Sequence, residues 1–295
     1  STRNIFDIQL LPGDSFKDDI TVFNLSKDIA LPLRIELSLW DINEDSDDIE
    51  FVYSEPALNA SSWFSLETRD IVLQPDESRS VAFDINVPKD VSPGSYLVMM
   101  RFQPQLALDS GAVSTIPELG VLFFIQISLL GLEQDSPLYS ATIESFDASH
   151  AKGVPLISRA RAGIYEDMAQ EFLAKVKNNG IYHFKTSGFI EIKNMFGTTV
   201  ARAELPEKYL LPNRVRNIEI QVQEDPSFWK RLLQVGPYSA VMVLNVPGQK
   251  DPLLATMGFF AFPWKIILAS AWALLVAFFA RRRVIGSFSA LFRRT

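Results

Sequence analysis

A glycine, one further residue and a tyrosine precede an apolar run in SPGSYLVMM, residues 92–100. The same device returns in VGPYSAVMV, residues 235–243. Glycine adopts backbone angles that strain other residues, and a tyrosine at the start of a strand can fix the corner with its hydroxyl. Each stretch therefore predicts a tight turn followed by a strand, and the recurrence suggests one domain design used twice.

The segments around these two turns also recur in the same order. DDITVFNLSKD (18–28) resembles QEFLAKVKNNG (170–180), because each is an apolar strand that ends at an asparagine turn. VLQPDESRSVAFDINV (72–87) parallels LLPNRVRNIEIQV (210–222), with leucine, proline, a polar turn and an alternating strand. Alternation with a period of two, interrupted by turn residues, is typical of antiparallel immunoglobulin-like (Ig-like) sandwiches.

These patterns predict an all-β fold with two tandem Ig-like β-sandwich domains followed by one C-terminal transmembrane α-helix. The predicted limits are 1–133 for the first domain, 139–258 for the second, 259–283 for the transmembrane helix and 284–295 for a basic cytoplasmic tail. DPSFWKRLLQ, residues 225–234, is predicted to form a short helix within the second domain, since Asp225 and Pro226 stand at its start.

The membrane prediction rests on the uncharged run from Ile266 to Ala280 and on the arginines that follow it. At about 1.5 Å per residue the run covers ~22 Å, and the apolar residues from Met257 onward lengthen it. The positive-inside rule then places the tail in the cytoplasm and both sandwiches outside the cell. The residues predicted to anchor the helix are Trp264, Lys265, Arg281, Arg282 and Arg283. Export requires a signal peptide, which we hypothesise was removed before Ser1.

Composition limits the classes of function. The chain of 295 residues has no cysteine, and its 35 acidic residues outnumber its 28 basic ones. Disulfides, thiolate catalysis and cysteine-based zinc sites are therefore excluded, and the acidic balance argues against nucleic-acid binding.

A family resemblance adds to this interpretation. The first half contains FNLSKDIALPLRIEL, an acidic loop, SSWFSL, and LQPDESRSVAFDINVPKDVSPGSYLVMM, in that order. It resembles the first domain of the bacterial WxL-interacting surface proteins and related Ig-like exported, membrane-anchored proteins. The residues that carry the resemblance are Asn24, Trp63, Leu73, Pro75, Val87, Pro88, Pro93, Gly94 and Tyr96. The resemblance implies an envelope protein that binds other surface proteins or the cell wall.

Candidate metal and catalytic sites are few. In DINEDSDDIE (41–50), Asp41, Asn43 and Asp45 match the start of a calcium loop, but Ser46 and Val52 stand where glycine and glutamate are needed. A looser calcium site and a plain solvated loop both stay open. The two histidines, His150 and His183, lack metal spacing and have no evident nucleophile and acid beside them in sequence. We therefore predict no cofactor and no enzymatic activity.

The sequence thus predicts a non-enzymatic cell-envelope protein that binds another surface or wall component through its Ig-like domains, in a hetero-oligomer. Phe228 and Trp229 are predicted as an exposed aromatic contact for that partner. One alternative is a structural subunit of a larger membrane complex, assembled through Ala269, Ala273 and Ala277 of the helix. A second alternative is a carbohydrate-active or other hydrolytic enzyme, for which no paired carboxylates in a cleft are evident.

Overall fold

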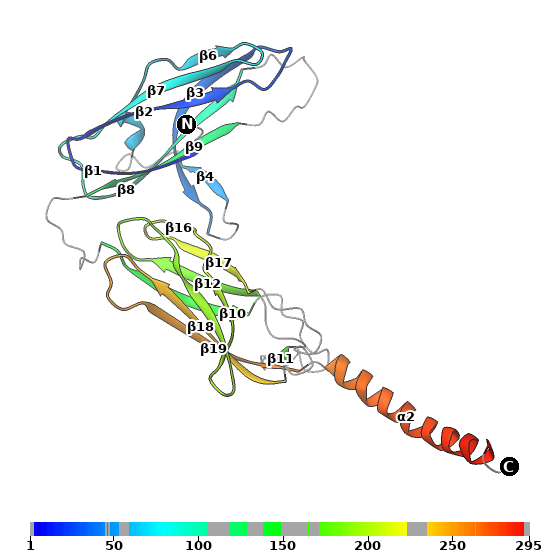
Figure 1. Ribbon diagram of the computed structural model, residues 1–295. Helices are drawn as coiled ribbons and strands as arrows, with labels where there is room; N and C mark the ends of the chain where they lie inside the picture. The colour runs from blue at the N-terminus through cyan, green and yellow to red at the C-terminus, as the bar shows by residue number, and fades with distance from the viewer. Residues whose placement is uncertain are drawn as a thin grey trace.

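Two β-sandwiches stacked end to end, with a helix leaving the lower one, form the computed structural model of this chain (Figure 1). The structure describes residues 3–44, 46, 48–52, 59–105, 118–128, 138–148, 164–165, 171–222, 235–262 and 264–291. The predicted short helix at 225–234 lies outside the described residues.

The first sandwich packs a six-stranded sheet on a three-stranded one. The larger sheet has the order β1 (Ile5–Leu10), β9 (Leu119–Ile127), β8 (Gly94–Pro104), β3 (Leu31–Ile42) and β4 (Ile49–Val52), and β6 (Asp70–Leu73) also pairs with β3. The smaller sheet has the order β2 (Ser15–Phe23), β7 (Ser78–Asn86) and β5 (Phe64–Leu66), which follows a short 3-10 helix, η2 (Ala60–Trp63). Between the sheets lies a core that includes Phe83, Phe102 and Phe123.

The second sandwich has the same plan. One sheet has the order β11 (Ile164–Tyr165), β19 (Leu253–Ala261), β18 (Gly236–Asn245), β14 (Ser187–Asn194) and β15 (Thr199–Glu204). The facing sheet consists of β10 (Ala141–Ala148), β12 (Glu171–Asn178) and β17 (Val215–Gln221), and a ribbon of β13 (Phe184–Lys185) and β16 (Tyr209–Leu210) closes the upper end. Its core is separate from that of the first sandwich and includes Phe172, Ile190 and Ile220.

The two glycine–tyrosine turns occupy equivalent places in the two sandwiches. Gly94 begins β8 and Gly236 begins β18, with φ angles of 157° and 135° respectively. At the first turn the Tyr96 hydroxyl donates a hydrogen bond of 2.9 Å to the Ser92 carbonyl, four residues upstream. The tyrosine therefore fixes the corner, as its position in the sequence predicts.

The asparagine turns also match. Asn24 directly follows β2, and its amide donates to the carbonyls of Ile29 and Leu73 at 2.8 and 3.2 Å. Asn178 ends β12, and its amide donates to the carbonyls of Tyr182 and Leu210 at 2.9 Å each. Both side chains are buried, so each amide satisfies backbone groups that water cannot reach.

The helix α2 (Trp264–Leu291) begins after β19 and leads away from the sandwich (Figure 1). In the part of the chain that the structure describes, no helix combines the length and the apolar character needed to cross a membrane. The prediction of a single-pass protein in the cell membrane, with extracytoplasmic sandwiches and a cytoplasmic C-terminus, is therefore wrong. The physical reason is that Lys265 and Arg281 bound the uncharged run, whose ~22 Å falls short of a bilayer core of about 30 Å.

The residues predicted as a membrane anchor all lie in this helix. Trp264 and Lys265 form its first turn, where the Lys265 ammonium lies 5.6 Å from the centre of the Trp264 ring. Arg281, Arg282 and Arg283 follow in its second half. The predicted boundary between residues 258 and 259 falls inside β19, which continues to Ala261.

Candidate functional site

The junction between the two sandwiches brings together residues that are far apart in sequence. The outer face of the larger first-sandwich sheet rests on the upper end of the second sandwich. Trp40 and Ile42 of β3, Met99 of β8 and Phe124 of β9 are buried there against Leu211, which follows β16. The Phe124 and Tyr209 rings stack with their centroids 3.9 Å apart. This apolar contact makes the junction a packed interface rather than a linker.

His183 is the polar centre of the junction. Its side chain is only 2 % exposed. The imidazole Nδ1 lies 2.7 Å from the Ser95 hydroxyl, and Nε2 lies 3.2 Å from a carboxylate oxygen of Asp7. The His183 backbone N–H donates to the same Ser95 hydroxyl at 2.7 Å. One tautomer satisfies every contact: the serine hydroxyl donates to Nδ1, while Nε2–H donates to the carboxylate.

Asp7 receives a second hydrogen bond, from the Tyr209 hydroxyl at 3.0 Å. The hydrogen bond from His183 is the main reason that the pKa of Asp7 lies below its ordinary value, although partial burial opposes it. Burial, together with the Asp7 carboxylate, raises the pKa of Tyr209. One carboxylate of the first sandwich thus holds two aromatic side chains of the second.

The order carboxylate, imidazole, hydroxyl is also that of a hydrolytic triad. Two features favour a structural tie here. The Ser95 oxygen already accepts the backbone N–H of His183, and the imidazole is almost wholly covered by the two sandwiches. A nucleophile needs a free oxygen facing a substrate, whereas this oxygen bridges two domains.

The lowered pKa of Asp7 leads to a pH-dependent prediction. An acid whose pKa is lower in the folded state contributes stability above its unfolded pKa of about 4, and that contribution is lost as pH falls through the folded pKa. In urea unfolding from pH 7 to pH 3, Asp7→Asn is expected to be less stable than the wild type at pH 7. The difference should shrink below about pH 4. A difference that stays constant over this range would contradict the assignment.

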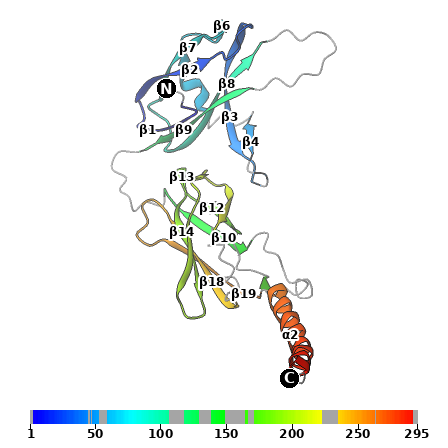
Figure 2. The ribbon, with the colours of Figure 1, turned by 45° about the vertical axis from the view of Figure 1, so that its right-hand side comes forward.

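The acidic loop after β3 also contacts the second sandwich. The Asp41 carboxylate forms an ion pair with Arg214, whose Nε donates to it at 2.8 Å. A carboxylate oxygen of Glu44 accepts the backbone N–H of Val215 at 3.3 Å. Figures 1 and 2 both show β3 and β4 reaching down from the upper sandwich toward the lower one. The sequence suggested a calcium loop at 41–50. Within the described residues, which omit 45 and 47, no group of three potential metal ligands occurs.

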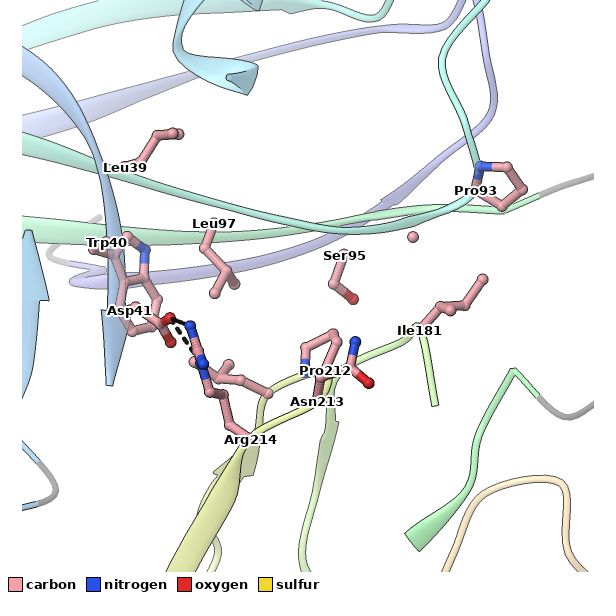
Figure 3. Close-up of a pocket in the computed structure, with 12 residues that line it drawn as sticks. Leu39, Trp40, Asp41, Pro93, Ser95, Leu97, Ile181, Pro212, Asn213 and Arg214 are labelled. Carbon is pink, nitrogen blue, oxygen red and sulfur yellow. Dashed lines mark hydrogen bonds and ion pairs between the residues drawn. The ribbon is translucent and has the colours of Figure 1, made fainter. Parts of the chain in front are cut away.

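A cavity of about 290 Å³ lies beside this junction (Figure 3). Leu39, Trp40 and Leu97 line it from the first sandwich, and Ile181 and Pro212 line it from the second. Its walls are therefore mainly apolar, with the Asp41–Arg214 pair at one side (Figure 3). Trp40 is 3 % exposed, and its buried indole N–H has no hydrogen-bond partner in the described part of the chain.

The sequence predicted the partner-binding site in a different part of the chain. Phe228 and Trp229, the predicted partner contact, lie outside the described residues. The sequence indicated no site at His183, because no evident nucleophile and acid stand beside it, yet Ser95 and Asp7 reach it from 88 and 176 residues away.

One sequence signal could have revealed the junction. Val98, Met99 and Met100 are all buried, as are Phe123, Phe124 and Ile125. Three consecutive apolar residues in an antiparallel strand indicate a sheet covered on both faces, because successive side chains point to opposite faces. The run therefore predicts a second packing surface outside the sandwich core.

Comparison with known proteins gives structural likeness alone. No family model and no curated protein matches the sequence. Among solved structures, the chain is similar to the class 5 fimbriae chaperone CfaA, with 12 % identity, a TM-score of 0.39, and 85 % of this chain and 95 % of that chain covered. It is also similar to the CupB2 chaperone of Pseudomonas aeruginosa, with 9 % identity, a TM-score of 0.36, and coverages of 88 % and 98 %. The E. coli chaperone DraB shows 13 % identity, a TM-score of 0.34, and coverages of 89 % and 94 %.

Proposed function

We propose that this chain is a non-enzymatic protein-binding protein that seats a segment of another cell-surface or envelope protein in the cavity between its two sandwiches. The kinship with WxL-interacting surface proteins inferred from the sequence is compatible with this role and stays a prediction. The proposal rests on the site itself, described above, and not on the likeness to solved structures.

The mainly apolar cavity between the two sandwiches is the observation that carries the proposal. Leu39 and Leu97 line it from the first sandwich and Ile181 and Pro212 line it from the second, with the Asp41–Arg214 ion pair at one side. Mainly apolar clefts with a few polar groups are typical of binding sites. A polypeptide segment suits this cleft, because an apolar side chain fills the space while its backbone groups pair with the charged side chains.

The ties around His183 support the same function. They fix one sandwich against the other beside the cavity, with Ser95 belonging both to the ties and to the cavity wall. A cavity held open before binding needs less ordering when the partner arrives, which improves affinity.

Site-specific photo-crosslinking tests the proposal. A benzophenone amino acid at Ile181, which lines the cavity and is 38 % exposed, is expected to crosslink a partner polypeptide in native cell extracts. The same group at Val200 on β15, which does not line the cavity, serves as the matched control.

Leu97→Lys supplies the decisive comparison, since it places a charge on the apolar wall of the cavity. We expect crosslinking at Ile181 to fall at least tenfold, because an apolar side chain of the partner would then meet a charged group. Equal yields at Ile181 and Val200, or full crosslinking in Leu97→Lys, would rule out the cavity as the binding site.

A further inference from the structure

The strand β2 forms one edge of the smaller sheet of the first sandwich. Among the described residues, β7 is the one strand paired with it, in register from Ser15 opposite Asn86 to Phe23 opposite Ser78. This sheet packs on the opposite side of the core from the junction with the second sandwich. The edge is therefore separate from the cavity proposed above.

The hydrogen bonds show which residues face the open side of β2. The Asn24 N–H donates to the Glu77 carbonyl at 2.9 Å, and the Val87 N–H donates to the Asp14 carbonyl at 2.9 Å. In an antiparallel pair, hydrogen-bonded and non-hydrogen-bonded positions alternate. The backbone N–H and C=O groups of the even-numbered residues of β2 therefore point toward β7. The odd-numbered Lys17, Asp19, Thr21 and Phe23 direct their backbone groups outward. Accordingly, the Asp19 N–H donates to the side chain of Asp18 at 2.9 Å instead of to β7.

The second sandwich contains a strand at the place that corresponds to the outer edge of β2. The Asn178 N–H donates to the Arg214 carbonyl at 3.0 Å, as the Asn24 N–H does to Glu77. When Asn24 is matched with Asn178, β2 corresponds to β12 and β7 corresponds to β17. The registers agree, because Phe23 lies opposite Ser78 as Lys177 lies opposite Val215. The outer edge of β12 is covered from Phe172 to Asn178 by the antiparallel strand β10. In the first sandwich, the first strand, β1, pairs instead with β9 in the other sheet.

The register of β10 also defines what a strand on β2 would need. In the second sandwich, Phe146 lies opposite Ala174 and Ile143 opposite Val176, which correspond to Ile20 and Val22 of β2. Apolar side chains of the added strand opposite Ile20 and Val22 would extend the core of the first sandwich. Asp147 lies opposite Leu173, which corresponds to the exposed Asp19. Because a like charge there is unfavourable, a strand suited to β2 carries a basic residue at that point.

We infer that the outer edge of β2, from Lys17 to Phe23, binds an extended antiparallel segment of a partner protein that has alternating apolar residues and a basic residue opposite Asp19. The segment adds a fourth strand to the sheet, with backbone hydrogen bonds to the outward groups of Asp19 and Thr21. Its backbone N–H and C=O groups provide affinity, and the pair with Asp19 provides selectivity. The bound segment displaces the Asp18 side chain from the Asp19 N–H.

A synthetic peptide tests the edge directly on the full chain. Its sequence is that of residues 139–148, YSATIESFDA, carrying Glu144→Lys and Asp147→Lys. In fluorescence anisotropy we expect saturable binding to the wild type. Thr21→Pro is expected to weaken binding at least tenfold, because it removes an outward N–H that makes no bond to β7. Thr21→Ala, which keeps the N–H, should leave the affinity within about twofold.

A charge exchange provides a second and independent test. Asp19→Lys should reverse the preference, so that the unmodified acidic peptide binds at least tenfold better than the lysine peptide. This variant keeps the backbone intact and decides the matter even if Thr21→Pro fails to fold.

Two results would overturn the inference. One is peptide affinity that neither Thr21→Pro nor Asp19→Lys changes. The other is a dimer in sedimentation analysis that binds no peptide and that Thr21→Pro dissociates, because a second copy of the chain would then occupy the edge. Neither result affects crosslinking at Ile181, so the edge and the cavity can fail separately.

Discussion

His183→Ala is expected to lower the free energy of unfolding by about 3 kcal/mol, because the imidazole is buried between the two sandwiches and bonded to two strands of the first one, through Ser95 of β8 and Asp7 of β1. Truncation leaves the Ser95 hydroxyl and the Asp7 carboxylate without that partner. It also opens a void beside Phe124, whose ring centroid lies 5.3 Å from that of His183. Urea denaturation followed by tryptophan fluorescence measures the loss.

Small-angle scattering separates this effect from simple unfolding. If His183 fixes the angle between the sandwiches, the folded variant should have a larger radius of gyration than the wild type, while far-UV circular dichroism stays unchanged. Tyr209→Phe is the graded control, since it deletes one hydroxyl that donates to Asp7 and should reduce stability by about 1 kcal/mol. Wild-type stability and dimensions in His183→Ala would show that apolar packing alone sets the junction.

Asn178→Ala is expected to reduce stability by about 3 kcal/mol, because its fully buried amide bonds three backbone groups. The amide donates to Tyr182 and Leu210 and accepts the N–H of Gly180 at 2.9 Å. Alanine removes all three bonds, although the Gly180 N–H keeps a bond of 3.2 Å to the Ser140 carbonyl. Thermal and urea unfolding of the full chain measure the effect.

The internal repeat supplies matched variants for this experiment. Asn24→Ala in the first sandwich should reduce stability by a similar amount, since Asn24 is also buried and also bridges two loops. Asn179→Ala changes the exposed neighbour, whose amide donates to the Thr142 hydroxyl, and should reduce stability by under about 1 kcal/mol. Equal effects at positions 178 and 179 would show that the buried amide has no special role.

The repeated turns show which features of the fold the local sequence predicts. Gly94 and Gly236 begin equivalent strands because glycine, which lacks a Cβ atom, adopts the positive φ angle of these turns without steric strain. Asn24 and Asn178 end equivalent strands because a short amide side chain bonds the neighbouring backbone. The all-β character and the likeness of the two sandwiches therefore follow from patterns within about a dozen residues.

The membrane prediction shows where a local pattern misleads. A short apolar run followed by arginines, at residues 266–283, is typical of an anchor, but charges at both ends limit its length. Whether this run could span a bilayer depended on how many neighbouring apolar residues lengthen the helix, and composition alone does not give that number.

By itself, the sequence determined many of the strands, several of their turns and the repetition of one sandwich plan, because these depend on backbone preferences and on periodicity along the chain. Only the tertiary structure decided the junction, the cavity and the open edge of β2. Asp7, Ser95 and His183 meet through the packing of two sandwiches, and β1 pairs with β9 where β10 pairs with β12. Contacts between residues so distant in the chain leave no periodic signature, since each depends on which faces and edges come together in space.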